Sequence, residues 1–299
     1  MTLTAFFLIL LSVFLHAGWN FLSKAGHPSA AFYLLMALTE WTMTLPFLLF
    51  ADTGVGEMGP RFWLLLLGSG VSEICYVLGL YHAYRRCDIS LAYPMARALP
   101  VLTVPLVTIA FGLGEPPAGI ALAGMAAVVV GCLLMPLRTL AEFRPGIYVN
   151  PALGAILLAA IGTTGYTVCD SQALSMLIAT GKGGRISCCF VYLSLVEVQI
   201  IIGLVVYILL HRREQVAFRQ LFLKSYWPPL AGFFAASAYL LVLLAMGFVT
   251  NVSFVQVFRQ MSLPLGVLAG IFLLKERCPP VKLAGISLVL LGLLLTAVS

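Results

Sequence analysis

The stretch GEPPAGIALAGMAAVVVG (residues 114–131) recurs in outline near the end of the chain, as KERCPPVKLAGISLVLLG (residues 275–292). In the first stretch, Glu115 is followed by Gly124 nine residues later and by a second glycine after seven more. The second stretch repeats both intervals from Glu276, at an offset of 161 residues. A repeat at a fixed offset indicates that the chain consists of two similar halves.

Other matches between the two halves occur in the same order along the chain. They are Arg97 with Arg259, GWNFLSK (18–24) with GYTVCDS (165–171), and Glu40 with Glu197. Each match alone is weak, but together they are hard to explain by chance. The order of the matches therefore predicts a duplicated unit.

The composition is that of a membrane protein. Of the 299 residues, 62% are hydrophobic and only 9% are charged, and the mean hydropathy is +1.06. A soluble domain carries about 25% charged residues, so this chain lacks the polar surface to coat a water-soluble body. The first apolar run has no preceding basic residue and no convincing cleavage site, so we expect a first span rather than a cleaved signal.

Ten apolar segments approach the length needed to cross a bilayer, which is about 20 residues. They lie near 3–23, 30–51, 62–84, 90–112, 117–137, 151–172, 186–210, 227–249, 252–274 and 280–298. Five spans per half is an odd number, so the second half must enter the membrane from the opposite side. We therefore predict an all-α polytopic membrane protein built from two inverted five-helix repeats, residues 1–142 and 143–299.

Loop charges predict the orientation. The loops after odd-numbered spans hold twelve basic residues, whereas those after even-numbered spans hold three. Basic loops face the cytoplasm, so we expect both termini outside, in a cytoplasmic (inner) membrane. The net charge of +6 is then explained by orientation in the lipid bilayer, and nucleic acid is not an expected partner.

Metal and cofactor chemistry is not expected. The seven cysteines fall mostly in apolar segments, and none forms a CxxC pair. Such spacing does not predict a metal site or a disulfide framework. We expect no catalytic residues and no cofactor.

Acidic residues within apolar segments are the first candidates for function. A charged side chain near the bilayer centre costs about 2.5–3.5 kcal/mol on insertion scales, so it usually faces a cavity or a partner. Glu40, Glu73 and Glu197 are such acids. They are candidates for proton coupling or for binding a cationic substrate. The alternative is that Arg97, Arg259 or hydroxyl groups of neighbouring helices satisfy them.

Aromatic and amide side chains extend this set. Glu73 and Tyr76 fall on one helical face, and a carboxylate near tyrosines suits an organic cation. The alternative is a stripe of tyrosines that only packs between helices. Further aromatic and amide candidates are Trp19, Asn20, Tyr93 and Tyr166.

Arg97 and Arg259 each stand about two turns into a span, with prolines nearby. One interpretation is that these guanidinium groups bind a carboxylate or phosphate of the substrate. The alternative is that they keep a cavity closed on one side through a salt bridge or a contact with a helix end. We expect the prolines to interrupt the helices near a cavity, the alternative being a plain kink. Gln256 adds a polar neighbour to Arg259.

Glycines at regular spacing predict close helix contacts. The glycines at 124, 131, 285 and 292 and the GxxxG pair Gly266 and Gly270 are interpreted as contacts between the halves or between subunits. Both a monomer and a homodimer remain open.

These features resemble the drug/metabolite transporter (DMT) superfamily, EamA type, over essentially the whole chain. The resemblance rests on the ten spans, the polar first helix LHAGWNFLSK (15–24), SLAYPMARALP (90–100) and the paired GE…G…G and KER…G…G ends. It implies a central cavity lined by spans 1–4 and 6–9, with spans 5 and 10 as scaffold. The implied substrate-binding residues are Trp19, Asn20, Glu40, Glu73, Tyr76, Tyr93, Arg97, Tyr166, Gln256 and Arg259.

Many relatives carry a basic residue where Glu40 stands, so this chain favours a cation or a zwitterion. The resemblance implies a secondary active transporter that moves a small polar metabolite by alternating access. We expect an amino acid, a derivative or an organic cation such as a quaternary amine, with proton coupling as a further hypothesis. The alternatives are a lipid-carrier flippase of the same fold and a membrane-embedded lipid-modifying enzyme. The enzyme is disfavoured because the short loops hold no cluster of nucleophilic, acid–base or metal-binding residues.

Overall fold

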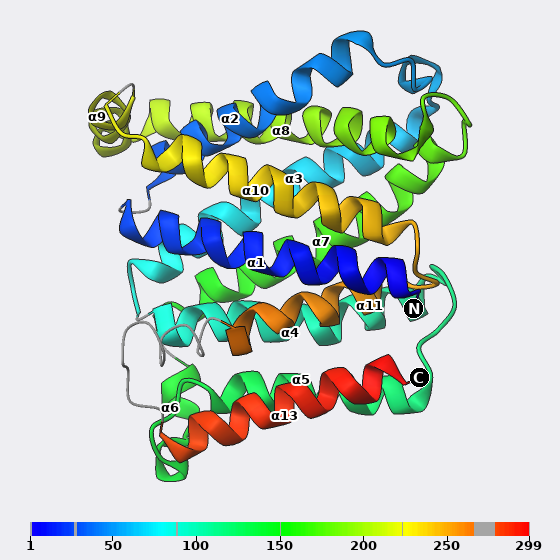
Figure 1. Cartoon of the computed structure of the whole chain (residues 1–299). Coiled ribbons are helices and arrows are strands. Elements are labelled where there is room, and N and C mark those ends of the chain that lie inside the picture. Colours follow the sequence, from blue (N-terminus) through cyan, green and yellow to red (C-terminus); the bar gives the residue numbers. More distant parts are fainter. Residues whose placement is uncertain are drawn as a thin grey trace.

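The computed structural model describes residues 2–26, 29–87, 89–149, 151–222, 224–265 and 279–298. The helices of this part of the chain are α1 (Leu3–Ala25), α2 (Ala30–Phe50), α3 (Pro60–Tyr84), α4 (Ile89–Ala110), α5 (Gly119–Leu134), α6 (Pro145–Tyr148), α7 (Leu153–Ile178), α8 (Gly184–Leu210), α9 (Arg212–Leu221), α10 (Trp227–Met246), α11 (Val252–Phe258) and α13 (Pro280–Ala297). Three short 3-10 turns are η1 (Val55–Glu57), η2 (Leu140–Glu142) and η3 (Arg259–Met261). The long helices lie side by side as one bundle, and α9 crosses one end of it (Figure 1).

Eight of these helices are long and apolar enough to cross a membrane, namely α1, α2, α3, α4, α7, α8, α10 and α13. The chain is therefore an all-helical, multi-pass membrane protein. Helix α5 is apolar but has only 16 residues. The expected span 252–274 begins with α11 and η3, but residues 266–278, with Gly266, Gly270 and Glu276, lie outside the described residues.

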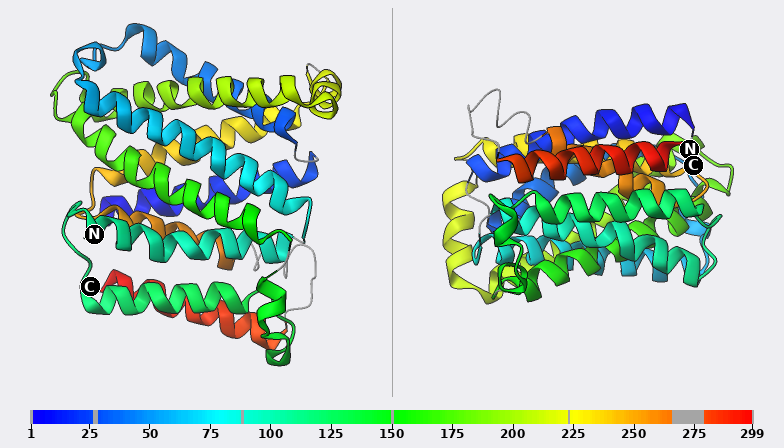
Figure 2. Two further views of the ribbon diagram at one scale, coloured as in Figure 1. Left: turned by 180° about the vertical axis from the view of Figure 1, so that it is seen from behind. Right: turned by 90° about the horizontal axis from the view of Figure 1, so that it is seen from below.

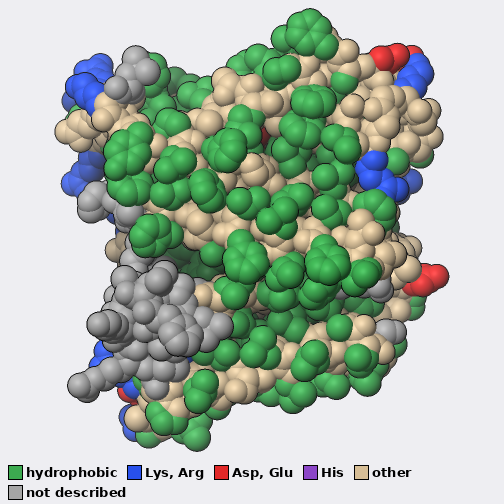
Figure 3. Space-filling model, in the orientation of Figure 1, with side chains coloured by type: hydrophobic (Ala, Val, Ile, Leu, Met, Phe, Trp, Pro, Cys, Tyr) green, Lys and Arg blue, Asp and Glu red, His purple; other side chains and the backbone are tan. Residues whose placement is uncertain are grey.

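The surface agrees with this assignment. Hydrophobic side chains cover the sides of the bundle, whereas most lysines and arginines lie toward its two ends (Figure 3). Large apolar residues such as Phe7, Phe14 and Phe21 on α1 are more than half exposed. A water-soluble protein rarely exposes such a continuous apolar band, so this band is the surface that faces lipid.

Local signals in the sequence explain where several helices begin. The side chains of Thr2, Ser29 and Asn251 accept hydrogen bonds from the first turns of α1, α2 and α11. Proline stands in the first turn of α3, α10 and α13, where its missing N–H costs nothing. Serine, threonine and asparagine are common N-cap residues because their side-chain oxygen accepts a hydrogen bond from a free backbone N–H of the first turn.

The segment 211–226, expected from sequence to be a loop, contains helix α9. This helix is amphipathic, with Glu214 buried and Arg212, Arg213 and Arg219 exposed. A search for apolar runs of about 20 residues misses such a helix because it is short and strongly charged. Similarly, the expected loop 138–150 contains η2 and α6.

The expectation of an interrupted helix at Arg97 is wrong. Helix α4 continues through all three of its prolines, at positions 94, 100 and 105. In the second half, by contrast, α11 ends at Phe258 and a 3-10 turn begins at Arg259. The change of helical geometry therefore occurs at only one of the two arginines.

Four long contacts hold the bundle together. Helix α1 packs along α10, α3 along α7, α2 along α8, and α5 along α13. The α5–α13 pair forms one edge of the bundle, as the views from the front and from behind both show (Figure 1 and Figure 2). The two helices of this pair run in opposite directions, because α5 starts at the end of the bundle where α13 finishes.

Glycines make the α5–α13 crossing close. A Cβ atom at Gly124 would lie 2.6 Å from the carbonyl oxygen of Gly292, and one at Gly131 would lie 2.6 Å from that of Gly285. No side chain larger than hydrogen fits these separations without moving the helices apart. The glycines of the repeated motif thus meet each other within one chain.

The two ends of the bundle differ. Helix α9 and the connections α1–α2, α3–α4 and α8–α10 lie at one end, here named the α9 end (Figure 1). Both termini and the connections α2–α3, α4–α5, α7–α8 and α10–α11 lie at the other, here named the terminal end. The three exposed arginines of α9 make the α9 end basic.

Candidate functional site: a central cavity

A cavity of about 90 Å³ lies in the middle of the bundle. A single water needs about 10–15 Å³ on such a measure, so the cavity has room for a few waters or a small organic molecule. Its polar and aromatic lining residues are Ser12, His16, Trp19, Tyr33, Glu40, Glu73, Tyr76, Arg97, Tyr166, Glu197, Tyr239 and Arg259.

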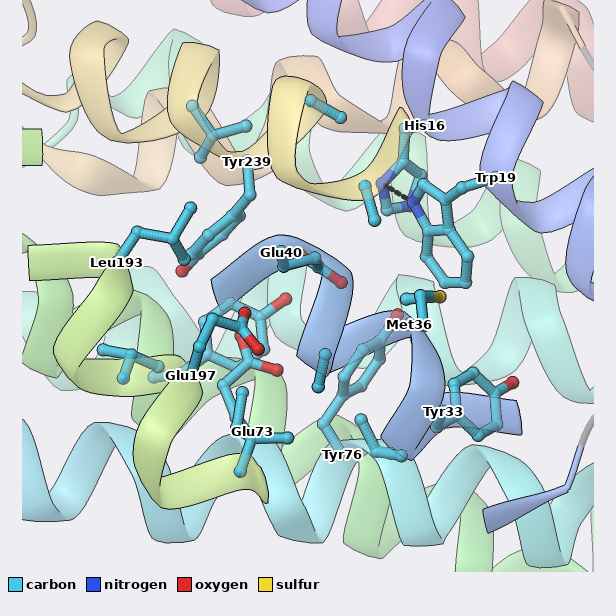
Figure 4. A pocket seen from close by; sticks show the side chains of 18 of the residues that line it. His16, Trp19, Tyr33, Met36, Glu40, Glu73, Tyr76, Leu193, Glu197 and Tyr239 are labelled. Atoms are coloured by element: carbon cyan, nitrogen blue, oxygen red, sulfur yellow. Dashed lines mark hydrogen bonds between the residues drawn. The ribbon is translucent and has the colours of Figure 1, made fainter. Parts of the chain in front are cut away.

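Three carboxyl groups form an acidic side of the cavity. Glu40 on α2, Glu73 on α3 and Glu197 on α8 point into the same space (Figure 4). Glu40 and Glu197 are only 6% and 4% exposed, and the three carboxyl groups lie close enough for their charges to interact. The Glu197 carboxyl group lies within hydrogen-bonding reach of Glu40, but within the described residues its Oε2 has no N–H or hydroxyl donor as a partner. A buried polar atom without a partner is costly, so this side suits an added donor.

Arg97 is held by two acceptors and also lies beside His16. Its Nη1 lies 3.1 Å from Nε2 of His16, and its Nη2 donates to the backbone oxygen of Arg259 at 2.8 Å and to Oγ of Ser262 at 3.0 Å. Trp19 in turn donates to Nδ1 of His16 at 2.9 Å (Figure 4). Arg97 therefore connects α4 with α1 and with the segment around η3.

Arg259 is held mainly by aromatic rings. Its guanidinium carbon lies 5.9 Å from the ring centre of Tyr166 and 5.7 Å from that of Tyr239. The one hydrogen bond of its guanidinium in the described structure is a long one, 3.4 Å from Nη1 to the Tyr166 hydroxyl oxygen. A guanidinium has five N–H donors, so Arg259 keeps donors for another partner.

The acids and arginines of the cavity do not pair directly. Within the described ranges, the only ion pair with a nitrogen–oxygen distance below 4.0 Å joins Nζ of Lys182 to Oε1 of Glu57 at 2.5 Å. It lies on the surface of the terminal end. The cavity thus carries an acidic side and a basic side that face it separately. The alternative in which Arg97 or Arg259 satisfies the acids does not describe this conformation.

Asp170 is a buried hub beside the cavity. Its side chain is 0% exposed and accepts hydrogen bonds from Ser69 on α3, Tyr192 on α8 at 2.7 Å and Tyr239 on α10. Three helices are therefore tied to α7 through one carboxyl group. Because Tyr239 also packs against the Arg259 guanidinium, this hub positions the basic side of the cavity.

Of the residues predicted from sequence, Trp19, Glu40, Glu73, Tyr76, Arg97, Tyr166, Glu197 and Arg259 line the cavity. The others do not. Nδ2 of Asn20 donates to the backbone oxygen of His16 at 2.8 Å. The ring of Tyr93 faces Arg97, with 5.6 Å between the ring centre and the guanidinium carbon. Gln256 is 1% exposed on α11 and lies away from the cavity lining.

Sequence reasoning missed Tyr239, which lines the cavity, whereas His16 had stood out as a titratable residue in an apolar segment. Tyr239 stands among small and aliphatic residues in AASAYLL (235–241), so a hydroxyl within an apolar span was its signal. His16 lies one turn before Trp19 and contacts both Trp19 and Arg97.

The cavity reaches from the middle of the bundle toward the α9 end. Trp19, Tyr33, Leu80 and Leu204 all line it and all lie in the parts of their helices nearest that end. Toward the terminal end the lining stops near the middle of most helices. The cavity is therefore asymmetric along the bundle axis.

The terminal end is closed by contacts between loops. The Glu115 backbone N–H donates to the Thr250 carbonyl at 3.2 Å, and Nδ2 of Asn251 donates to the Glu115 carbonyl at 3.0 Å. The hydroxyl of Thr180 donates to the Thr53 carbonyl at 3.1 Å. These bonds join the α4–α5 and α2–α3 loops to loops of the second half.

Glu214 on α9 makes the corresponding contact at the α9 end. Its Oε1 accepts from the Tyr81 hydroxyl at 2.6 Å and its Oε2 from the Ala31 backbone N–H at 3.2 Å, and Arg85 donates to the same hydroxyl at 2.6 Å. Glu214 is 6% exposed. One carboxyl group thus ties α9 to the start of α2 and the end of α3.

Replacing Glu214 with alanine is expected to release α9. The Tyr81 hydroxyl and the Ala31 N–H lose their acceptor, which costs about 1–3 kcal/mol for buried groups. Hydrogen exchange should accelerate at the first turn of α2. The matched control is Gln220→Ala on the exposed face of α9, and equal exchange in both variants would contradict the contact.

No protein-family model and no curated protein matches this sequence. A solved crystal structure resembles the chain with a TM-score of 0.64, covering 98% of this chain and 97% of the other. The two share 15% sequence identity. A likeness at this identity concerns the fold, so the function must be argued from the cavity.

Proposed function

We propose that this chain is a secondary active transporter of the DMT superfamily, EamA type, which moves a small polar metabolite by alternating access. The observation that carries the proposal is the central cavity, which holds three acids and two arginines among membrane-spanning helices. Ionisable residues inside a membrane usually mark a substrate or ion pathway. The substrates that fit best are an amino acid, a derivative or an organic cation.

The packing supports two inverted repeats of five spans, residues 1–142 and 143–299. If α1–α5 correspond to α7, α8, α10, α11 and α13 in order, then the α1–α10 contact corresponds to the α7–α3 contact. Exchanging the two halves swaps α2 with α8 and α5 with α13, so each of these two contacts is mapped onto itself. All four are the major contacts of the bundle, as a pseudo-two-fold axis in the membrane plane requires.

The cavity's asymmetry supports alternating access. It approaches the α9 end, while loop contacts between the halves close the terminal end. One such state implies a partner state in which these loops separate.

The basic α9 end is the cytoplasmic side in this proposal, so the C-terminus, at the opposite end (Figure 1), lies outside. A reporter that is active only in the cytoplasm, fused to the C-terminus of the protein in the inner membrane, is therefore expected to stay inactive. An active reporter would contradict the orientation.

The proton-coupling part is tested with Glu40→Gln and Glu73→Gln. In proteoliposomes, the wild type is expected to accumulate substrate when a pH gradient is imposed, because a buried carboxyl group is able to carry a proton across. Both variants are expected to lose this response, whereas Glu115→Gln on an exposed loop is expected to keep it. Indifference of the wild type to the gradient, with unchanged variants, would contradict coupling.

A further inference from the structure

We infer that the cavity binds a small zwitterion, with a primary ammonium at the acidic side and a carboxylate at Arg259. The inference rests on the proposed function and narrows its substrate class. Both sides of the cavity have unused capacity in the described structure: an oxygen of Glu197 that receives no hydrogen bond from an N–H or hydroxyl donor, and spare N–H donors on Arg259. A ligand with one charge would use only one of them.

The acidic side fits an ammonium group. Carboxyl groups arrive from three separate helices and point toward one space (Figure 4). A primary ammonium has three N–H donors directed apart, so it is able to contact Glu40, Glu73 and Glu197 together. Tyr76 lines the same space, and the face of a tyrosine ring attracts a cation.

The basic side fits a carboxylate at Arg259 rather than at Arg97. Arg97 donates through Nη2 to the Arg259 backbone and to Ser262, and its Nη1 lies beside His16. Its Nε has no partner in the described residues, but the bonds at Nη2 fix the guanidinium, so Arg97 acts as a positioning residue. The Arg259 guanidinium lies against the rings of Tyr166 and Tyr239, which leaves its N–H edge for a ligand. A guanidinium edge matches a carboxylate with two parallel hydrogen bonds.

The separation of the acids from the arginines argues for both groups in one molecule. The charges of Glu73 and Arg259 interact, yet no ion pair within 4.0 Å joins the two sides across the described ranges. A zwitterion places one charged group on each side, whereas a lone cation or a lone anion contacts only one side. The volume of about 90 Å³ limits the ligand to a small molecule.

Binding of matched compounds to the purified full-length protein tests this directly. The zwitterions are glycine, β-alanine, 4-aminobutyrate and 5-aminovalerate, and each is compared with the amine lacking its carboxylate and the acid lacking its ammonium. Calorimetry should show at least one zwitterion binding about tenfold or more tightly than both of its analogues, which corresponds to about 1.4 kcal/mol. An amine that binds as tightly as its zwitterion, or no binding in the whole series, would overturn the inference.

Variants assign the two ends of the ligand. Arg259→Gln should remove the preference for the zwitterion over the amine, and Glu197→Gln should remove the preference over the acid. Arg259→Lys keeps the positive charge but loses the paired N–H groups of the guanidinium, so it should retain part of the preference. This variant also provides a test if Arg259→Gln fails to fold. Arg213→Gln on the exposed face of α9 should leave both preferences unchanged. Preferences that persist in Arg259→Gln and Glu197→Gln would overturn the assignment.

A parallel exchange assay in proteoliposomes separates the two claims. Binding with the expected preferences but without exchange would keep the zwitterion site and contradict the transporter. Exchange of an organic cation that lacks a carboxylate, at the rate of the zwitterion, would keep the transporter and overturn the zwitterion site.

Discussion

Replacing Asp170 with alanine is expected to lower the free energy of unfolding by about 2–5 kcal/mol. The carboxyl group accepts hydrogen bonds from Ser69, Tyr192 and Tyr239, which come from three different helices. Side-chain hydrogen bonds in membrane proteins contribute about 0.6 kcal/mol on average and about 1.7 kcal/mol at most. The substitution removes three of them at once and leaves three hydroxyl groups buried without an acceptor.

Reversible unfolding of the purified protein in mixed micelles measures this loss. Tyr192→Phe removes a single bond of the hub, so it should cost about 0.6–1.7 kcal/mol. Ser175→Ala, on the exposed side of the same helix, should have little effect. If Asp170→Ala costs no more than Tyr192→Phe, then Asp170 is not the shared acceptor described here.

Gly124→Ala is expected to destabilise the protein at the crossing of α5 and α13. Its new Cβ would lie 2.5 Å from Oγ1 of Thr296 and 2.6 Å from the backbone oxygen of Gly292. Because the backbone of α13 cannot rotate away as a side chain can, α5 and α13 must separate. Overpacking of this kind costs about 1–3 kcal/mol.

The same helix provides a matched control. A Cβ at Gly119 would meet nothing within 4 Å, so Gly119→Ala should be neutral or slightly stabilising, because alanine favours a helix over glycine. The melting temperatures of the two variants measure the difference. Equal melting temperatures would show that α5 and α13 do not cross at Gly124.

Much of the fold follows from the pattern of apolar residues. Runs of about 20 apolar residues mark helices that need membrane burial, and the eight long helices lie where such runs occur. The glycine spacing of the repeated motif also indicated close contact, although not that α5 meets α13. Helix α9 was missed because its stability depends on tertiary contacts such as Glu214 with Tyr81, which no local pattern reveals.

The candidate site was recognisable in part for an energetic reason. Charged residues in apolar runs are costly, so Glu40, Glu73 and Arg259 stood out from their neighbours. Their partners did not stand out, because which face of a helix meets a cavity depends on packing. Gln256 and Tyr239 illustrate the difference: the first is buried away from the cavity, whereas the second lines it.

Transport by the purified protein is the most direct measure of the proposed function. Proteoliposomes on a solid support are exposed to the zwitterion series and to quaternary amines, and charge movement is recorded with a pH gradient imposed. The expected result is a saturable current in the wild type that is absent in Glu197→Gln and Arg259→Gln and present in Arg213→Gln. Currents that are no larger in the wild type than in protein-free liposomes, for every compound, would contradict proton-coupled transport through this cavity.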